Sequence, residues 1–315
     1  MISSLELARL CGVSQGTVDR ALHGRAGISL KTRDRILGLA QQHGYRPNPA
    51  ARELITGQSG TVGAIIPSVN NIFFMDLFAE IGRRLKERNL RLQLTPVESR
   101  EDFLAALDDF AARRHRMALV IPPEEGIEVP PSVSKHMALV SLVGPCEGTG
   151  VHFLAPDERE TGRTAVRYLH DRGHRRILHL TYTRRSHAIA ARAKGYEEQV
   201  RALGLSPQVL AGVDRASLAR AIEEGRPTAL FCHNDWLALK TIMLLSEMGL
   251  RVPEDISVLG VDNSPTLAAI NPSLTTLAYP MEAIGASVLG VLDGKPAQLA
   301  GAPMQIIERA TVKTI

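Results

Sequence analysis

The residues best suited to chemistry near the start of the chain lie in the stretch GVSQGTVDRAL, residues 12–22. Its apolar members, Val13, Val18, Ala21 and Leu22, recur at the spacing of one face of a helix. The other side chains are small, polar or cationic, and on a helix such side chains can contact phosphates and base edges in the major groove of DNA. They are Ser14, Gln15, Gly16, Thr17 and Arg20. The stretch predicts either a DNA-reading helix or an ordinary surface helix with one buried face.

The positive charge of the chain is concentrated in its first residues. The whole sequence of 315 residues has a formal net charge of +4. Residues 1–57 contain eight Lys or Arg and four Asp or Glu, so they hold the whole excess, and the rest of the chain holds 29 of each sign. A solvated basic face is one interpretation, but an excess confined to the segment with this helix favours a phosphate-binding module.

Helix signals around that stretch predict a three-helix domain over residues 1–46. Ser3 followed by Glu6 is a capping box that starts a first helix, and Gly12 supplies the turn into the second. Ser29 begins a third helix, which Gly44 ends. The predicted core residues of the first and third helices are Leu7, Ala8, Leu10, Ile36, Leu37, Leu39 and Ala40.

Residues 47–58 are predicted to form a hinge helix and linker. Asn48 followed by Pro49 is a favourable helix start, because the Asn side chain caps the first turn and proline fits within it. The segment AARELI then provides at most two turns, too few for a stable isolated helix. We expect the helix to form only against DNA and a partner chain, and a flexible linker is the alternative.

Apolar runs alternate with helical patterns from Thr61 onward, which is typical of parallel sheets covered by helices on both faces. The runs are TVGAIIP, RLQLTP, MALVIP, ALVSLV, VHFLA, RRILHL, TALFC and ISVLGV, with a last strand in MQIIERATV. Residues 59–315 are many for one such sheet. We therefore predict two doubly wound α/β lobes, the first over about 59–156 and 279–300 and the second over about 157–278 and 301–315.

Polar side chains follow several of these runs, at the sheet edge where ligands of such folds bind. Carboxylates, amides, an arginine and an aromatic ring suit a polyhydroxylated ligand, because the polar groups bind hydroxyls and the ring stacks on the apolar face of a sugar. The candidates are Asn71, Phe73, Asp157, Arg192, Asn234 and Asp262, with Ser68, Asn70, Asp235 and Asn263 in similar positions. Each Asn or Asp alone is equally well explained as a helix cap, so the prediction of a ligand site depends on the set.

The sequence as a whole resembles the lactose/galactose-repressor family of bacterial transcription regulators. The matching segments, in the family's order and spacing, are LARLCGVSQGTVDRAL, GYRPNPAARELITG, TVGAIIPSVNNIFF, GHRRI, RAKGY, HNDWLAL, GLRVPEDISVLGVDN and NPSLTT. The resemblance implies a DNA-binding regulator, most often a repressor. Its lobes would resemble periplasmic sugar-binding proteins and close on a small-molecule effector, a sugar or sugar derivative. It also implies a homodimer on a roughly palindromic operator.

The resemblance assigns roles to matching positions in this chain. Gln15, Gly16 and Arg20 match base-reading positions, and Ser14 and Thr17 match phosphate-contacting ones. In the predicted hinge helix, Asn48 lies at the start and Leu54 matches the leucine that wedges into the minor groove at the operator centre. The family's cleft positions fall on Asn71, Phe73, Asp157, Arg192, Asn234 and Asp262.

Several residues depart from the family's pattern. Asp19 stands where a serine is usual, and an acid facing phosphates weakens DNA binding unless it accepts from a cytosine or braces an arginine. We expect it to tune operator preference. Ile72 replaces a proline, and Asn263 replaces the second acid of a DD pair. Tyr279 replaces a glutamine and is expected to bring another ligand-binding ring to the cleft mouth.

Two further features have alternative interpretations. Trp236 either stacks on a ligand or packs inside the protein, and we favour packing. The basic loop over residues 183–187 indicates an acidic or phosphorylated effector or, as we favour, a solvated loop.

Composition argues against other classes of protein. No apolar run approaches the roughly 20 residues of a membrane span, and we find no secretion signal, so we expect a cytoplasmic protein without a membrane partner. Three dispersed cysteines and the spacing of the histidines indicate neither disulfides nor a metal site. Because catalytic and phosphate-cradling motifs are missing, we expect no cofactor and no enzymatic activity. A sugar-transport component and a sugar-metabolising enzyme are the alternatives. Without a C-terminal heptad tail, a dimer is the expected assembly.

Overall fold

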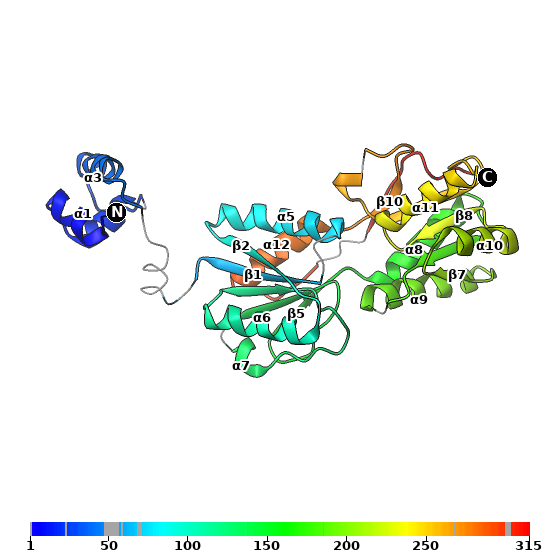
Figure 1. Ribbon diagram of the computed structural model, residues 1–315, viewed down its shortest axis with the longest axis horizontal. Coiled ribbons are helices and arrows are strands. Elements are labelled where there is room, and N and C mark those ends of the chain that lie inside the picture. Colours follow the sequence, from blue (N-terminus) through cyan, green and yellow to red (C-terminus); the bar gives the residue numbers. More distant parts are fainter. Residues whose placement is uncertain are drawn as a thin grey trace. The chain divides into compact units, whose positions relative to one another are not determined.

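The chain divides into two units, Met1–Gln58 and Ser59–Ile315. The computed structural model describes residues 2–22, 24–46, 57, 59–67, 71–135, 137–184, 186–267, 269–299 and 304–315, and its elements are labelled in Figure 1. The first unit contains three short helices. These are α1 (Ser4–Cys11), α2 (Gln15–Leu22) and α3 (Leu30–Gln42).

Local sequence signals set the ends of these three helices. Ser3 and Glu6 form the predicted capping box, and Gly12 turns the chain at a φ of 60°. The small core contains Leu7, Ala8, Cys11, Val18, Ala21, Ile36 and Ala40. Two core predictions are wrong, because Leu10 is 51% and Leu37 is 41% exposed. Leu10 precedes the buried Cys11, and Leu37 follows the buried Ile36. A shift of one position rotates a helical side chain by about 100°.

The first sheet of the second unit has five parallel strands in the order β2–β1–β3–β4–β5. Helices α5 and α12 cover one face and α6 covers the other (Figure 1). The close approach of α6 depends on Gly63, because a Cβ at that position would lie 2.3 Å from the Phe110 ring. The bounds are β1 Thr61–Ile66, α5 Ile72–Glu87, β2 Arg91–Pro96, α6 Arg100–Ala112, β3 Met117–Val120, α7 Pro131–Ser134, β4 Ala138–Leu142, β5 Val151–Leu154 and α12 Met281–Leu292.

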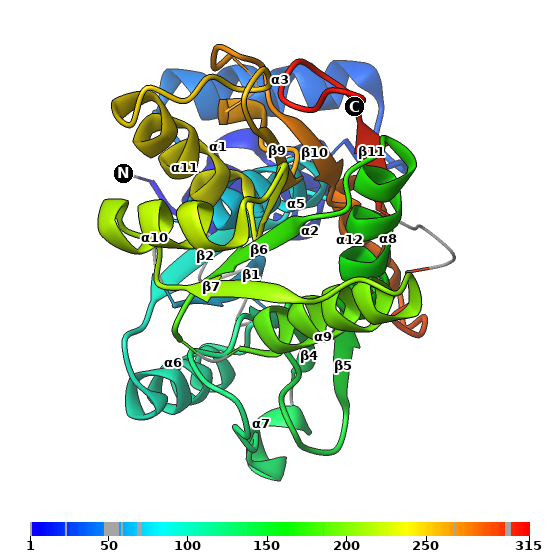
Figure 2. The same cartoon turned by 90° about the vertical axis from the view of Figure 1, so that its right-hand side faces the viewer.

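The second sheet has the order β11–β10–β9–β8–β6–β7, with only the β10–β11 pair antiparallel. Residues alternate along the strands, so that Phe231 faces the core under α8 and α9 while Leu230 faces the core under α10 and α11. Helices α8 and α9 pack directly on each other (Figure 2). The bounds are α8 Glu158–Asp171, β6 Ile177–Thr181, α9 His187–Ala202, β7 Gln208–Ala211, α10 Arg215–Gly225, β8 Ala229–Cys232, α11 Asp235–Glu247, β9 Ser257–Asp262, η1 Pro265–Leu267, β10 Thr275–Ala278 and β11 Gln305–Ile307.

The structure adds elements that the sequence pattern did not predict. Strands β7 and β10 and helix α12 were not expected, and the predicted last strand in MQIIERATV is reduced to Gln305–Ile307. Strand β10 begins with Thr275 and Thr276, so its sequence shows no apolar run there, although both threonines are fully buried. Their hydroxyls are satisfied by Arg309 N and by the Asp235 carboxylate, respectively. Buried threonines with such partners are indistinguishable from surface threonines in a sequence.

Candidate functional sites

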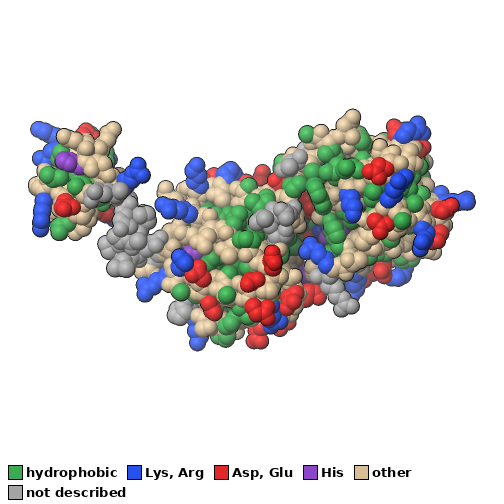
Figure 3. All heavy atoms as spheres, in the orientation of Figure 1, with side chains coloured by type: hydrophobic (Ala, Val, Ile, Leu, Met, Phe, Trp, Pro, Cys, Tyr) green, Lys and Arg blue, Asp and Glu red, His purple; other side chains and the backbone are tan. Residues whose placement is uncertain are grey.

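Helix α2 presents a polar surface on the outside of the first unit. Val18 and Ala21 face the core, which leaves the opposite side of the helix in solvent. Ser14 precedes the helix, and its Oγ accepts from Thr17 N at 3.2 Å and lies 2.9 Å from Thr17 Oγ1. Figure 3 shows Lys and Arg side chains on several sides of this unit. The exposed side of α2 therefore carries polar and cationic side chains, the types that contact the DNA backbone.

The two long side chains predicted to read bases are held by their own unit. Gln15 Nε2 donates to Ser4 Oγ at 2.5 Å, and Arg20 Nε donates to the Gly16 carbonyl oxygen at 3.2 Å. Both residues remain exposed. The structure therefore places them on the outward surface of α2, next to Gly16, and their contacts with DNA stay predictions.

Asp19 lies beside an arginine in the structure. Its Oδ2 is 2.9 Å from Arg25 Nη1, and both side chains are about half exposed. The arrangement is that of an acid bracing an arginine, one of the alternatives for this position. Because the pair is solvated, its contribution to stability is small.

Three of the predicted ligand residues are helix caps. Asn71 accepts from Phe73 N at the start of α5, Asp157 from Glu160 N at the start of α8, and Asn234 from Leu237 N at the start of α11. Asn234 Oδ1 also accepts from Tyr182 Oη at 2.9 Å. Each cap follows a strand of the sheets, so the caps fix where those helices begin beyond the strand ends. Their roles as ligand contacts stay predictions.

Phe73 and Tyr279 join the two lobes by an edge-to-face contact. Their ring centroids are 4.7 Å apart and the rings are inclined at 74°. Phe73 belongs to α5, whereas Tyr279 follows β10, and both are buried. In this conformation the Tyr279 ring is covered by Phe73, and its contact with a ligand stays a prediction. Its Oη is buried without a hydrogen-bond partner among the described residues, and burial raises its pKa well above the usual value.

Arg192 forms a buried ion pair with a residue outside the predicted set. Its Nε and Nη2 donate to Glu158 Oε2 at 2.9 and 2.5 Å, and its Nη1 donates to the His233 carbonyl oxygen. Burial raises the pKa of Glu158, and the guanidinium opposes that shift. Glu158 Oε1 and His233 Nδ1 are buried and have no partner within the described ranges. Burial also lowers the pKa of His233 well below its usual value.

Asp235 and Asp262 form a second buried acidic group beside this pair. Asp235 accepts from Thr276 Oγ1 at 2.6 Å and from Ser264 N at 3.1 Å. Burial raises the pKa of Asp235 to about 6. It also raises the pKa of Asp262 well above the usual value, and the charge of Asp235 adds to that shift. Two such carboxyls cannot both ionise without cost at neutral pH.

Helices α8 and α9 hold Arg192 and Glu158 together. A Cβ at Gly162 would lie 2.2 Å from the Arg192 carbonyl oxygen, and one at Gly195 would lie 1.8 Å from the Arg159 carbonyl oxygen. Only glycine permits this close backbone approach.

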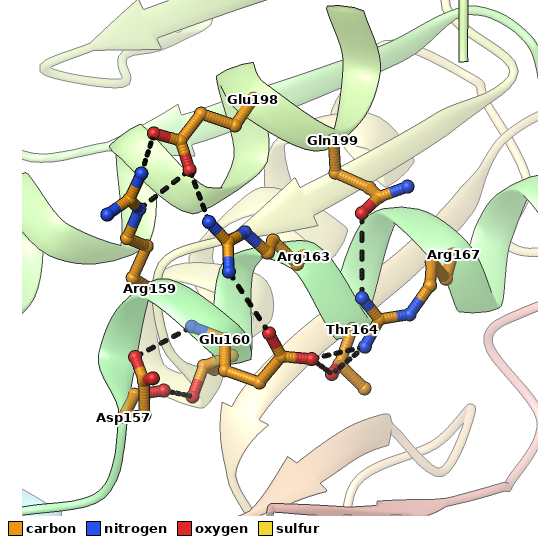
Figure 4. A network of polar contacts seen from close by, with 9 residues as sticks. Asp157, Arg159, Glu160, Arg163, Thr164, Arg167, Glu198 and Gln199 are labelled. Atoms are coloured by element: carbon orange, nitrogen blue, oxygen red, sulfur yellow. Dashed lines mark hydrogen bonds and ion pairs between the residues drawn. The ribbon is translucent and has the colours of Figure 1, made fainter. Parts of the chain in front are cut away.

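An outer ion network supports the same helix pair (Figure 4). Glu198 of α9 accepts from Arg159 Nε at 2.6 Å and from Arg163 Nη2 at 2.9 Å. The hydrogen bond from Arg159 is the main reason why the pKa of Glu198 falls to about 2. On α8 itself, Glu160 accepts from Arg167 at 2.5 Å.

Comparison with known families identifies two kinds of domain in the chain. Residues 5–48 match the model for bacterial regulatory proteins of the lacI family, and residues 166–312 match the periplasmic binding protein-like domain. The chain therefore combines a lacI-family DNA-binding domain with a periplasmic-binding-protein-like domain.

Individual transcription regulators align along nearly the whole chain. The HTH-type transcriptional repressor PurR of Vibrio atlanticus (strain LGP32) is 28% identical, over 100% of both chains. Catabolite control protein A of Priestia megaterium is 27% identical, over 92% of this chain and 91% of its own. The lac repressor dimer, solved with operator and the anti-inducer ONPF, has a TM-score of 0.79 at 21% identity over 99% of each chain, which shows a shared fold.

These matches decide the general function. They are all to DNA-binding transcription regulators, so this chain is a regulator rather than an enzyme or a transport component. The predicted fold class, a helix-turn-helix domain followed by two parallel-sheet lobes, is confirmed.

Two predicted DNA-contacting residues lie outside the described part of the chain, and two acidic residues of the proposed effector site were not among the predicted ligand residues. Asn48 and Leu54 lie outside the described residues. Glu158 was missed, although it directly follows the predicted Asp157 at the end of a strand–helix connection. Asp235 was noted only as a neighbour of Asn234. Trp236 is 52% exposed, so the preference for internal packing was wrong.

Within the described part of the chain, no group of three or more His, Cys, Asp or Glu side chains could hold a metal ion. None of the helices described there is long and apolar enough to cross a membrane.

Proposed function

We propose that this chain represses transcription as a homodimer on a roughly palindromic operator, and that a small molecule bound between its two lobes sets the operator affinity. The effector is a sugar or sugar derivative. The DNA contacts are assigned to the exposed side of α2, to the residues Ser14, Gln15, Gly16, Thr17 and Arg20, and to Asn48 and Leu54 of the hinge segment.

One observation carries the effector part of the proposal. Glu158 Oε1, His233 Nδ1 and Tyr279 Oη are buried and have no hydrogen-bond partners in the described part of the chain. Each of these residues follows the end of a strand, β5, β8 or β10, where open α/β sheets bind ligands. A buried polar atom without a partner costs about 1–3 kcal/mol. A ligand with hydroxyl groups would remove that cost.

The predicted ligand residues complete this site. Asp262 and Arg192 supply charge, Phe73 and Tyr279 supply rings, and Asn71, Asp157 and Asn234 supply amide and carboxylate groups at helix starts. Because Phe73 of the first lobe touches Tyr279, which directly follows β10 of the second sheet, a ligand near these rings would act on both lobes. Hinge motion of the lobes would then change the spacing of the two DNA-binding units in the dimer. Such couplings are typically about 1–3 kcal/mol, or 5–150-fold in affinity.

A selection experiment tests this proposal. The full-length chain is used to select duplexes from a random library, and the binding of the selected duplex is then measured with a panel of sugars. We expect a palindromic consensus and at least one sugar that changes the affinity without being chemically altered. The direction of the change distinguishes an inducer from a co-repressor. A chain that selects no sequence would contradict the proposal.

A further inference from the structure

The Arg192 guanidinium lies in the proposed effector site, yet its donors are directed into the protein. Two of its nitrogens donate to Glu158 Oε2 and the third donates to the His233 carbonyl oxygen. The side chains of Arg192 and Glu158 are 3% and 1% exposed. Guanidinium groups are the usual protein partners of phosphates and carboxylates. The Nε–Nη2 edge of this guanidinium is therefore taken, and an anionic ligand would have to displace Glu158 to pair with that edge.

Glu158 keeps one oxygen available to a ligand. Both bonds from Arg192 go to Oε2, and Oε1 is buried without a partner among the described residues. The Arg192 guanidinium favours the ionised form of Glu158. An ionised carboxylate oxygen can only accept, so the ligand group that meets it must be a donor. Hydroxyl and ammonium groups meet that requirement, whereas ionised phosphate and carboxylate groups do not.

The charges around the ion pair are mainly negative. Burial and the carboxylates of Asp235, Glu158 and Asp76 all raise the pKa of Asp262, and Arg192 alone opposes them among the main influences. Arg184, from the basic loop, is exposed and lies 5.8 Å from the centre of the Tyr182 ring. Arg184 is thus solvated, whereas the charge of His187, from the same loop, partly opposes the rise in the pKa of Glu158.

We propose that Glu158 determines the charge class of the effector. By occupying Arg192, it reserves the site for neutral or cationic molecules that present hydroxyl or ammonium groups, and it excludes phosphorylated and carboxylated ones. This inference rests on the proposed function, because it concerns the same effector site.

Sulfate is a suitable probe, because it tests whether Arg192 is available to an anion without requiring the natural effector. The full-length chain is titrated with sodium sulfate at constant ionic strength, and binding is read from the rise in the unfolding midpoint. The variants are Glu158→Gln, the double variant Glu158→Gln/Arg192→Met, and Glu223→Gln. The last makes the same charge change at an exposed position of α10 and is the matched control.

We expect Glu158→Gln to bind sulfate at least about tenfold more tightly than the wild type, a difference of about 1.4 kcal/mol. Adding Arg192→Met should abolish this gain, and Glu223→Gln should behave as the wild type. The inference is overturned if Glu158→Gln folds without gaining affinity, or if its gain survives Arg192→Met. If Glu158→Gln does not fold, the inference is tested by comparing the sulfate titrations of the wild type and Arg192→Met. They should respond to sulfate equally, and a weaker response of Arg192→Met would contradict the inference.

A matched set of sugars provides an independent test on the wild type. Glucose, glucose phosphate and glucosamine share one ring and differ in charge, and ribose and ribose phosphate form a second set. In any set that binds measurably, we expect the phosphate ester to bind more weakly than its parent. Tighter binding of an ester would overturn the inference. Operator binding is measured in the same samples, so a failure of the proposed function is seen separately as an absence of any preferred duplex.

Discussion

The Ser264 hydroxyl donates a hydrogen bond to Asp76 Oδ2 and thereby links the two lobes. Asp76 lies in the second turn of α5, and Ser264 follows β9 in the second sheet. The backbone N–H of Ser264 also donates to Asp235 Oδ2 at 3.1 Å. The loop after β9 thus connects the buried acidic group to the opposite lobe. Separation of the lobes at this point would break the hydroxyl bond.

Replacing Ser264 by alanine should loosen the contact between the lobes. A hydrogen bond to a charged group contributes about 1.5–3 kcal/mol. We therefore expect amide hydrogen exchange to become about tenfold faster in the second turn of α5, around Asp76, and in residues 264–267. Hydrogen-exchange mass spectrometry measures this directly. Ser246→Ala, at an exposed position of α11, should leave exchange there unchanged, and equal exchange in Ser264→Ala and wild type would refute the role of this bond.

The Asp235–Asp262 pair predicts an unusual pH dependence of stability. The pKa of Asp235 is raised from 3.8 to about 6 in the folded chain, so the folded state holds its proton more tightly than the unfolded state. This contribution to stability is fully present below about pH 4 and is lost as the pH rises through about 6, by at most about 3 kcal/mol. The pKa of Asp262 is raised in the same direction.

Asp262→Asn should reduce this loss, because it removes the like charge beside Asp235. We expect the free energy of unfolding in urea to fall less between pH 5 and pH 8 in the variant, and the variant to be more stable at pH 8. Asp255→Asn is the control. Arg251 lowers the pKa of Asp255 to about 2, so this carboxyl does not titrate between pH 5 and pH 8. An equal loss in Asp262→Asn and wild type would show that the two carboxyls do not interact.

Gly195→Ala should destabilise the second lobe strongly. The added Cβ would lie 1.8 Å from the Arg159 carbonyl oxygen, so α8 and α9 must move apart, at a cost of about 3 kcal/mol or more. Gly290→Ala makes the same change in α12, where the nearest atom is a lysine side-chain carbon at 3.8 Å. That control should be neutral or stabilising by up to about 1 kcal/mol. Thermal and urea unfolding of both variants checks the prediction, and similar values for the two would argue against glycine-dependent packing.

Asp19→Ser should strengthen DNA binding. The change removes an anion from the exposed side of α2 and releases Arg25, so one more cation can approach a phosphate. We expect a plot of log affinity against log salt to become steeper by about one. Asp34→Ser makes the same charge change on α3 and should have a smaller effect. If Asp19→Ser alters neither the affinity nor the preferred bases, Asp19 does not tune operator recognition.

The sequence predicted those elements whose local signals are strong. Helix α8 runs over the predicted residues Glu158–Asp171, because a cap and a clear apolar stripe define it. Helix α12 was missed, since its sequence MEAIGASVLGVL is apolar on most sides and shows no helical period. Strand β10 was missed because its buried threonines are satisfied by distant residues.

The sequence predicted several residues of the proposed site, but it did not predict which of them form pairs. Asn71, Asp157 and Asn234 could be located because they follow strands, yet their side-chain oxygens cap helices in the structure. The pairing of Glu158 with Arg192 depends on the close approach of α8 and α9. That approach requires two glycines, and no local pattern shows which helices will meet at them.

The central claim is that operator affinity responds to a molecule held beside the Arg192–Glu158 pair. The most direct measurement is a fluorescence anisotropy titration of the selected operator duplex with full-length wild type and Arg192→Met, each with and without the active sugar. We expect the sugar to change the wild-type affinity by 5–150-fold. We expect no such change in Arg192→Met, whose affinity without sugar should equal that of the wild type. A chain with no preferred duplex, or an equal sugar response in both proteins, would contradict the claim.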